Sequence, residues 1–185
     1  MKVLVASDIH GSVKYTKKLI EAFHQEEADQ ILLLGDVLYH GPRNALPEEY
    51  NPLEVAELLQ EYIDCIWAVR GNCDSEVDEM VLGFDLSADY RLFHIDGMDV
   101  IASHGHIYHP DHLPKHRGGI LFLFGHIHIP LAEKREGNYI GNPGSVSLPK
   151  GKTNSYGILE NKMWIVKDFE GNILDSIKID FESLF

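Results

Sequence analysis

Three short apolar runs near the start of the chain, separated by two amphipathic segments, constrain the fold more than any other feature. The runs are rich in valine, isoleucine and leucine, and the segments between them have apolar residues at helical spacing. Asn51 and Pro52 are typical of the first residues of a helix. The runs cover residues 2–6, 31–34 and 65–69, and the helical segments cover 12–26 and 51–62. Because two consecutive strand–helix–strand units place their strands in parallel, we expect a buried parallel sheet.

The second half of the chain changes to strands joined by turns. Residues 90–103 form two apolar runs around Asp96 and Gly97, which is a strong hairpin signal. Further strands are expected at three places, within 119–124, 130–142 and 155–180. The two halves are therefore predicted to give one sheet each of a sandwich flanked by helices, an α/β fold with α+β character. No linker divides the 185 residues, of which 44% are hydrophobic, so we expect a single domain, 1–185.

The chain is acidic, which argues against some partners. It has 16 basic and 29 acidic residues, and its formal charge of −13 repels nucleic acids. We therefore expect a small-molecule substrate and no nucleic-acid partner, and an anionic substrate must be attracted by a local positive charge. The N-terminal apolar stretch is too short for a signal peptide or a membrane span, and Cys65 and Cys73 make no disulfide framework. We expect a cytoplasmic protein without a membrane partner.

Side chains of the kind that bind metals follow five consecutive expected strands. They are Asp8 and His10 after the first strand, Asp36 after the second, Asn72 after the third, His104 after the hairpin, and His126 and His128 after the next strand. Ligands of open α/β sheets lie beyond the carboxyl ends of the strands, so these segments can converge on one crevice. The spacing of Asp8 and His10 adds to this, because alternate residues of an extended segment point the same way. Seven of the eleven histidines lie within 104–128, a density typical of metal binding.

Some of these candidate ligands, and three other histidines, have an ordinary structural explanation. Asp8 alone fits a helix cap, and Asp36 fits a solvated loop. His24, His40 and His94 are expected to be hydrogen-bonded core or surface residues without a functional role. Neither explanation accounts for ligand-type residues at all five strand ends.

Short motifs in the chain resemble, in their order, those of a known family. They are DIHG at 8–11, GD at 35–36, GNCD at 71–74, HGH at 104–106, GHIHIP at 125–130 and NPGS at 142–145. The set resembles the calcineurin-like metallophosphoesterases, in particular their small bacterial and archaeal phosphodiesterases, and the resemblance spans residues 3–147. It implies a two-layer β-sandwich of mixed sheets with helices outside and a dinuclear metal site at the strand ends.

The resemblance also implies which residues hold the metals. One ion would be held by Asp8, His10 and His128, the other by Asn72, His104 and His126, and Asp36 would bridge both. Imidazole and carboxylate ligands suit Mn²⁺, Fe²⁺, Zn²⁺ or Ni²⁺, and we expect two Mn²⁺ ions. A water shared by the ions would attack phosphorus directly, with Asp36 and Asn72 as catalytic residues, and the Asn72 amide would help to neutralise the phosphoryl oxygens.

Candidate substrate contacts are Asn72, Cys73, His106 and Arg70. Cys73 stands where many larger relatives have a histidine that protonates the leaving group, and it either contacts the substrate or is simply a small buried residue. His106 either reaches the phosphate or lies exposed in a loop. Arg70 either binds phosphate or forms a buried salt bridge at a strand end.

The activity that the resemblance implies is hydrolysis of small phosphodiesters. A phosphomonoesterase or a nucleotide pyrophosphatase would use the same metals, and a non-catalytic scaffold similar to the retromer subunit would share the fold. Segments 38–51 and 107–119 are rich in turn-forming residues. We expect them to wall the pocket as lids, or to make subunit contacts in a homo-oligomer.

Overall fold

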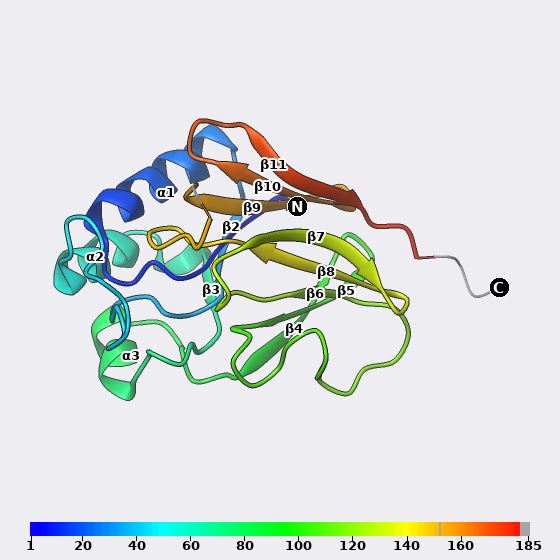
Figure 1. Ribbon diagram of the computed structural model, residues 1–185, viewed down its shortest axis with the longest axis horizontal. Coiled ribbons are helices and arrows are strands. Elements are labelled where there is room, and N and C mark those ends of the chain that lie inside the picture. The colour runs from blue at the N-terminus through cyan, green and yellow to red at the C-terminus, as the bar shows by residue number, and fades with distance from the viewer. Residues whose placement is uncertain (152, 182–185) are drawn as a thin grey trace.

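The computed structural model describes residues 1–151 and 153–181, which form two β-sheets packed face to face (Figure 1). The first sheet has the strand order β11 (Ile173–Lys178), β10 (Met163–Asp168), β9 (Ser155–Glu160), β1 (Val3–Ala6), β2 (Gln30–Leu33) and β3 (Ile66–Ala68). The second sheet has the order β4 (Tyr90–Ile95), β5 (Met98–Ser103), β6 (Leu121–Leu123), β8 (Asn138–Pro143) and β7 (Pro130–Arg135). The helices are α1 (Val13–Gln25), α2 (Pro52–Gln60), α3 (Glu76–Leu82) and the short 3₁₀ helix η1 (Ile63–Cys65). None of the helices in the described ranges is long and apolar enough to cross a membrane.

The strands and helices at the start of the chain follow the predicted pattern. β1 pairs in parallel with β2, and β2 pairs in parallel with β3. α1 begins after Ser12, whose hydroxyl accepts a hydrogen bond from the Tyr15 backbone N–H. α2 begins after Asn51, whose side chain accepts a hydrogen bond from the Glu54 backbone N–H. These caps end the strand-to-helix loops, and the same loops carry the predicted metal ligands.

Two further elements lie near the middle of the chain. The β4–β5 hairpin is confirmed, with Asp96 (φ 50°) and Gly97 (φ 76°) both in the left-handed region that such a tight turn requires. Helix α3 was not predicted. Its N-terminus is a capping box between Ser75 and Asp78, and it ends at Gly83.

The strands alternate between two cores. Val3 and Val5 of β1 point into the core between the sheets, whereas Leu4 and Ala6 pack with the helices. All four side chains are buried, as expected for a strand inside a parallel region. The helices cover only the first sheet, because the segment after β5, through Tyr108, packs on the outer face of the second.

The division of the chain between the sheets differs from the prediction. We expected each half to give one sheet, but β9, β10 and β11 join the first sheet, where β9 pairs antiparallel with β1. The physical reason is Trp164 of β10, which is fully buried between the sheets. A Cβ atom at Gly141 would lie 2.6 Å from its indole nitrogen, and one at Gly157 would lie 2.0 Å from its ring. The two glycines therefore leave the slot that this indole fills.

Candidate metal centre

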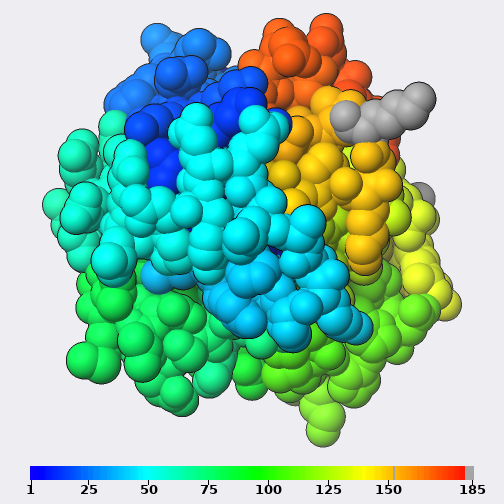
Figure 2. Space-filling model, turned by 60° about the vertical axis from the view of Figure 1, so that its left-hand side comes forward, coloured from blue at the N-terminus to red at the C-terminus, as the bar shows by residue number. Residues whose placement is uncertain are grey.

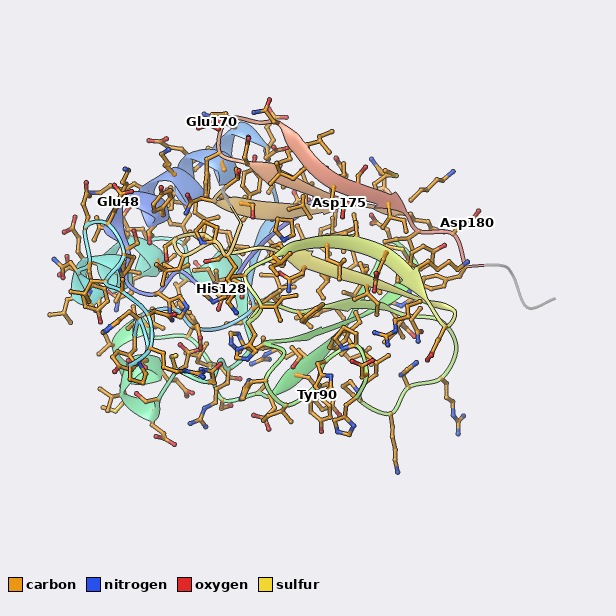
Figure 3. The ribbon with its side chains drawn as sticks, viewed as in Figure 1. Glu48, Tyr90, His128, Glu170, Asp175 and Asp180 are labelled. Atoms are coloured by element: carbon orange, nitrogen blue, oxygen red, sulfur yellow. The ribbon has the colours of Figure 1, made fainter. Side chains whose placement is uncertain are left out.

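The predicted ligand residues converge at one end of the two sheets. Figure 3 shows His128 at the end nearest the helices and Asp180 at the opposite end. Asp8, Asp36 and Asn72 follow β1, β2 and β3 of the first sheet, while His104 and His126 follow β5 and β6 of the second. The site therefore lies where the carboxyl ends of strands from both sheets meet, as the sequence predicts.

The backbone at these residues departs from the predicted extended form. Five of the ligand residues have positive φ: Asp8 (59°), His10 (50°), Asp36 (54°), His126 (65°) and His128 (59°). Non-glycine residues seldom adopt this left-handed conformation, and it persists only where surrounding contacts impose it. The expectation that an extended segment aligns Asp8 with His10 was therefore wrong in its mechanism. Tight left-handed turns, and not strand geometry, direct these side chains into the site.

Asp8, His10 and His128, here called the first cluster, are buried together. His10 Nε2 lies 3.5 Å from Asp8 Oδ1, and His128 Nε2 lies 3.1 Å from the same oxygen. Asp8 is fully buried and His10 is 1% exposed. The Nδ1 atom of His10 contacts the Tyr39 carbonyl at 2.8 Å, and Nδ1 of His128 contacts the Leu148 carbonyl. Because a carbonyl accepts only from a protonated nitrogen, each contact leaves Nε2 as the ring nitrogen available to an ion.

Asn72, His104 and His126, here called the second cluster, lie beside the first. His104 Nδ1 contacts the Leu34 carbonyl at 2.7 Å, which directs Nε2 into the site in the same way. That Nε2 atom lies 3.0 Å from Asn72 Oδ1 and 3.2 Å from His126 Nδ1. The His126 backbone N–H donates to Asp8 Oδ2 at 3.0 Å, so the two clusters share a fixed backbone contact. Asn72 is exposed and His126 is half-buried, so this cluster faces the solvent.

Asp36 lies between the two clusters. Its Oδ2 atom is 3.8 Å from His10 Nε2 and 3.4 Å from His104 Nε2, and its Oδ1 accepts from the Cys73 N–H at 2.8 Å. The buried carboxylate of Asp74 accepts from the backbone N–H groups of Asp36, Val37 and Gly71, and so fixes the turn that carries Asp36. Asp74 belongs to the GNCD motif, but no role was predicted for it.

At this site, burial and neighbouring charges shift the pKa values of the ionisable side chains in opposite directions. Burial raises the pKa of Asp8, but His10 and His128 together outweigh it and hold the pKa well below its usual range. Burial lowers the pKa of His104, yet Asp36 and Asp8 raise it to about 9. The carboxylates thus favour positive charge on the neighbouring imidazole, and a bound cation would supply such a charge in its place.

The donor atoms fit divalent metal ions. In the described part of the chain, Asp8 Oδ1 and His10 Nε2 are buried without a hydrogen-bond partner, as expected of atoms that hold an ion. Ligand atoms of Asp8, His10 and His128 lie within 4.8 Å of one another, and so do those of Asp8, Asp36 and His104. Carboxylate oxygens and imidazole nitrogens together suit transition-metal ions such as Mn²⁺ and Zn²⁺.

Cys73 sits at the edge of this centre. Its sulfur lies within 4.8 Å of ligand atoms of His10 and Asp36, and it accepts a hydrogen bond from Asn72 Nδ2 at 3.2 Å. Burial and then the charge of Asp36 raise the pKa of the thiol to about 12. In the metal-free protein the thiol is therefore protonated at pH 7 and is a weak acid.

The other two candidate substrate contacts, His106 and Arg70, lie in different surroundings. His106 lies close to the second cluster, with its ring 5.3 Å from that of His104, and burial lowers its pKa. Arg70 instead forms an ion pair with Glu76 at 3.9 Å, and its side chain is 39% exposed. The alternative of a buried salt bridge for Arg70 is thus wrong, because α3 places Glu76 on the surface.

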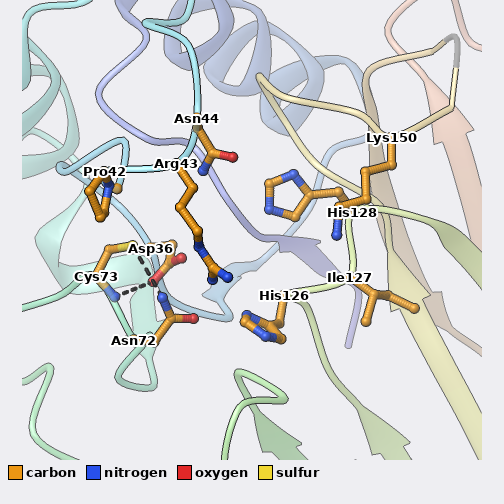
Figure 4. Close-up of a pocket in the computed structure, with 11 residues that line it drawn as sticks. Asp36, Pro42, Arg43, Asn44, Asn72, Cys73, His126, Ile127, His128 and Lys150 are labelled. Carbon is orange, nitrogen blue, oxygen red and sulfur yellow. Dashed lines mark hydrogen bonds between the residues drawn. The ribbon is translucent and has the colours of Figure 1, made fainter.

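A cavity of about 450 Å³ opens above the centre (Figure 4). Its floor includes Asp36, Asn72 and Cys73. Segment 38–51 supplies one wall, as predicted, whereas 107–119 does not line this cavity. The remaining lining residues come from this wall and from two segments of the opposite side, and they are Gly41, Pro42, Arg43, Asn44, His126, Ile127, His128 and Lys150. Sequence reasoning missed Arg43 and Lys150, because a single cation in an irregular loop carries no pattern.

Taken with the site, the comparisons define the class of protein. Residues 1–163 match the calcineurin-like phosphoesterase superfamily domain, and the chain belongs to this superfamily. The family resemblance of the motifs and the architecture of two mixed sheets are thereby confirmed.

Comparisons with individual proteins say more than the superfamily match does about the type of phosphoesterase. Phosphodiesterase YfcE of Escherichia coli (strain K12) is 48% identical over 162 residues, which cover 87% of this chain and 88% of YfcE. A solved structure of YfcE, described as a phosphoesterase from E. coli, matches with a TM-score of 0.94 and 43% identity over 97% of this chain and 100% of that one. Vps29 from Entamoeba histolytica, solved with zinc, matches with a TM-score of 0.63 and 17% identity over 98% of this chain and 100% of Vps29, which shows a shared fold alone.

Proposed function

We propose that this protein is a metal-dependent phosphodiesterase that hydrolyses small phosphodiesters. The observation that carries the proposal is the pair of ligand clusters joined by Asp36, in a chain 48% identical to a phosphodiesterase. In an acidic protein, two bound cations would be the largest local positive charge and would attract a phosphate ester. The two free cysteines are consistent with a reducing, cytoplasmic location.

The first cluster would hold one ion and the second cluster the other, with Asp36 between them. Mn²⁺ is the proposed metal, because the carboxylate and amide oxygens of the set suit Mn²⁺, while its imidazole nitrogens disfavour Mg²⁺. When bound, such ions polarise phosphoryl oxygens and lower the pKa of water from 15.7 toward about 7.

The chain's own residues would position the substrate. The Asn72 side chain, exposed at the floor of the cavity, can donate a hydrogen bond to a phosphoryl oxygen. Asp74 acts through Asp36, since it fixes the turn that carries the bridging carboxylate. Among the described residues, the cavity lining has no serine, threonine or tyrosine hydroxyl, and Cys73 is its one thiol. Attack by water is therefore the proposed route, because the cavity offers no hydroxyl nucleophile and its carboxylate and imidazoles are assigned to the ions.

The experiment is metal reconstitution with a panel of chromogenic esters. The protein is stripped with a chelator and reloaded with Mn²⁺ or Mg²⁺, and its rates with bis(4-nitrophenyl) phosphate and 4-nitrophenyl phosphate are compared. We expect Mn²⁺ to activate diester cleavage strongly and Mg²⁺ to do little. Faster cleavage of the monoester would indicate a phosphomonoesterase. Two bound ions without turnover of either ester would indicate a non-catalytic scaffold.

A further inference from the structure

Two cations face each other across the cavity above the metal centre. Arg43 belongs to the segment after β2, and Lys150 belongs to the segment between β8 and β9. Figure 4 shows the guanidinium of Arg43 pointing toward the middle of the cavity and the Lys150 ammonium group beside His128. The two segments also lie near each other on the surface, as the blue-cyan and yellow-orange regions of Figure 2 show.

The surrounding structure holds the backbone of Lys150 in this position. The Lys150 backbone N–H donates to the His128 carbonyl at 3.2 Å, and the Leu148 carbonyl accepts from the His128 ring. Ser145 and Ser147 of the same segment donate to the Asp8 carbonyl. The segment that carries Lys150 is therefore built onto the first cluster.

The Arg43 segment is fixed at both of its ends. The Tyr39 carbonyl contacts the ring of His10, and the Glu48 carbonyl accepts a hydrogen bond from the Ser12 hydroxyl. Arg43 lies in the exposed part between these anchors. The same contacts that position His10 thus bring the segment with Arg43 to the cavity.

These cations are available to a ligand. In the ranges 1–151 and 153–181, neither Arg43 nor Lys150 forms an ion pair, although the chain has 29 acidic residues. Some cations elsewhere, such as Lys14, Arg91 and Arg135, pair with a carboxylate, whereas Arg117 and Lys178 do not within the same ranges, so it is their shared cavity that sets Arg43 and Lys150 apart. Two unpaired cations on one cavity of a protein with net charge −13 favour an anionic ligand.

The balance of charges in the cavity indicates which group of a ligand Arg43 and Lys150 would bind. With two divalent ions bound, Asp8 and Asp36 leave two positive charges, and a diester monoanion with one hydroxide neutralises both. Arg43 and Lys150 then add two charges that a simple diester leaves unpaired.

We infer that Arg43 and Lys150 form a specificity clamp for phosphodiesters whose second organic arm carries a carboxylate or a phosphate. This inference rests on the proposed function, and it names the substrate class for the same site. The scissile phosphate lies at the metal centre, and the anionic end of the arm lies between the guanidinium and the ammonium group. Charge-assisted hydrogen bonds from two such donors are strong and would select the anionic arm.

The test uses 4-nitrophenyl diesters that share one leaving group and differ only in the other arm. The arms are choline (cationic), ethyl (neutral), 2-carboxyethyl and 2-phosphonoethyl (both anionic). We expect kcat/KM to rise from the cationic to the anionic arms. In Arg43→Gln and Lys150→Gln the ratio of anionic to neutral kcat/KM should fall about tenfold, mainly through KM. The two anionic arms distinguish carboxylate from phosphate recognition.

Matched controls are Arg117→Gln and Lys178→Gln, exposed cations outside this cavity, which should leave the ratio unchanged. Bound metal is measured in every variant and should not change. Equal rates for all arms in the wild type would overturn the clamp. Equal losses for neutral and anionic arms in Arg43→Gln would also overturn it, because Arg43 would then bind the scissile phosphate itself.

A binding measurement separates this inference from the proposed function. Calorimetry on the metal-loaded protein compares propane-1,3-disulfonate, an unreactive dianion, with methanesulfonate, a monoanion. The dianion should bind more tightly, and the preference should disappear in the double variant Arg43→Gln/Lys150→Gln. If no ester is cleaved, the proposed phosphodiesterase fails, but dianion selectivity that depends on both cations still supports the clamp. Selectivity that survives in the double variant would refute the clamp even in an active enzyme.

Discussion

The two ligand clusters are built differently, although each supplies two histidines and lies at strand ends. In the first cluster Asp8 and His10 are buried, and backbone carbonyls fix both imidazoles. In the second cluster Asn72 is exposed, and the ring of His126 contacts another imidazole instead of a carbonyl. Folding thus fixes both imidazoles of the first cluster, whereas in the second it fixes His104, through the Leu34 carbonyl, but leaves Asn72 and His126 with fewer contacts. Preorganised ligands lose less entropy on binding, so we expect the first cluster to bind metal more tightly.

The largest effect is expected where the clusters meet. Asp36→Asn should lower turnover more than about 100-fold and weaken both ions, because one carboxylate serves both clusters. Metal content and turnover are measured on the same sample, with Asp64→Asn, an exposed position on η1, as the matched control. Two retained ions and most of the rate in Asp36→Asn would rule out the bridging role.

A paired substitution separates the clusters directly. His10→Gln should abolish the tighter step of a Mn²⁺ titration, and His126→Gln should abolish the weaker one. His10→Gln should also destabilise the metal-free protein by about 1–3 kcal/mol, because it removes a partner from the buried Asp8 carboxylate. His126→Gln, half-exposed, should cost less. Urea unfolding and stepwise titration check both variants against His24→Gln, an exposed histidine on α1. Identical behaviour of the two cluster variants would contradict the comparison.

A smaller effect on turnover is expected when Cys73, on the open side of the site, is replaced. Positioned general acids contribute about 10²–10⁴-fold, most for poor leaving groups, and a neutral thiol supplies little of this. Aryl diesters should therefore react readily and alkyl diesters poorly, and Cys73→Ser should keep the aryl rate within about a few-fold.

Cys73→His sharpens the same test. It should raise the alkyl rate more than the aryl rate. Cys73 lines the cavity, so the larger ring has room on that side. A leaving-group series for the wild type and both variants, with metal content checked, measures this. If the wild-type rate barely depends on the leaving group while chemistry is limiting, another proton donor exists, and His106 would be the first to test.

The smallest effect is expected for a substitution of Glu26, which lies far from both clusters and should change only the stability of the protein. Burial raises its pKa, but hydrogen bonds from Lys167 (2.8 Å) and Tyr156 (2.9 Å) outweigh it and lower the pKa overall. A lowered folded-state pKa stabilises the protein above the unfolded value and loses that effect as pH falls through the folded value. Glu26→Gln should therefore be less stable than the wild type at pH 7, by about 1 kcal/mol at most, and the gap should close in acid. Urea unfolding across pH measures the gap, and bound metal should not change. A gap that widened in acid would contradict the sign.

The sequence by itself determined the local features. The β1–β3 strands, the cap at Asn51 and the Asp96–Gly97 turn follow from patterns within a few residues, and the structure confirms them. The convergence of the predicted ligand residues on one site also follows from the sequence, because each group stands just after an apolar run, while their binding of metal stays a prediction.

Only the tertiary structure decided the rest, because these features depend on contacts between distant segments. β9–β11 join the first sheet because Gly141 and Gly157 leave a slot for Trp164. Asp36 adopts its left-handed turn while Asp74 accepts three backbone hydrogen bonds beneath it. Arg43 and Lys150 line the same cavity because loops anchored to opposite sides of the site carry them there, and neither loop has a periodicity that reveals where it will lie.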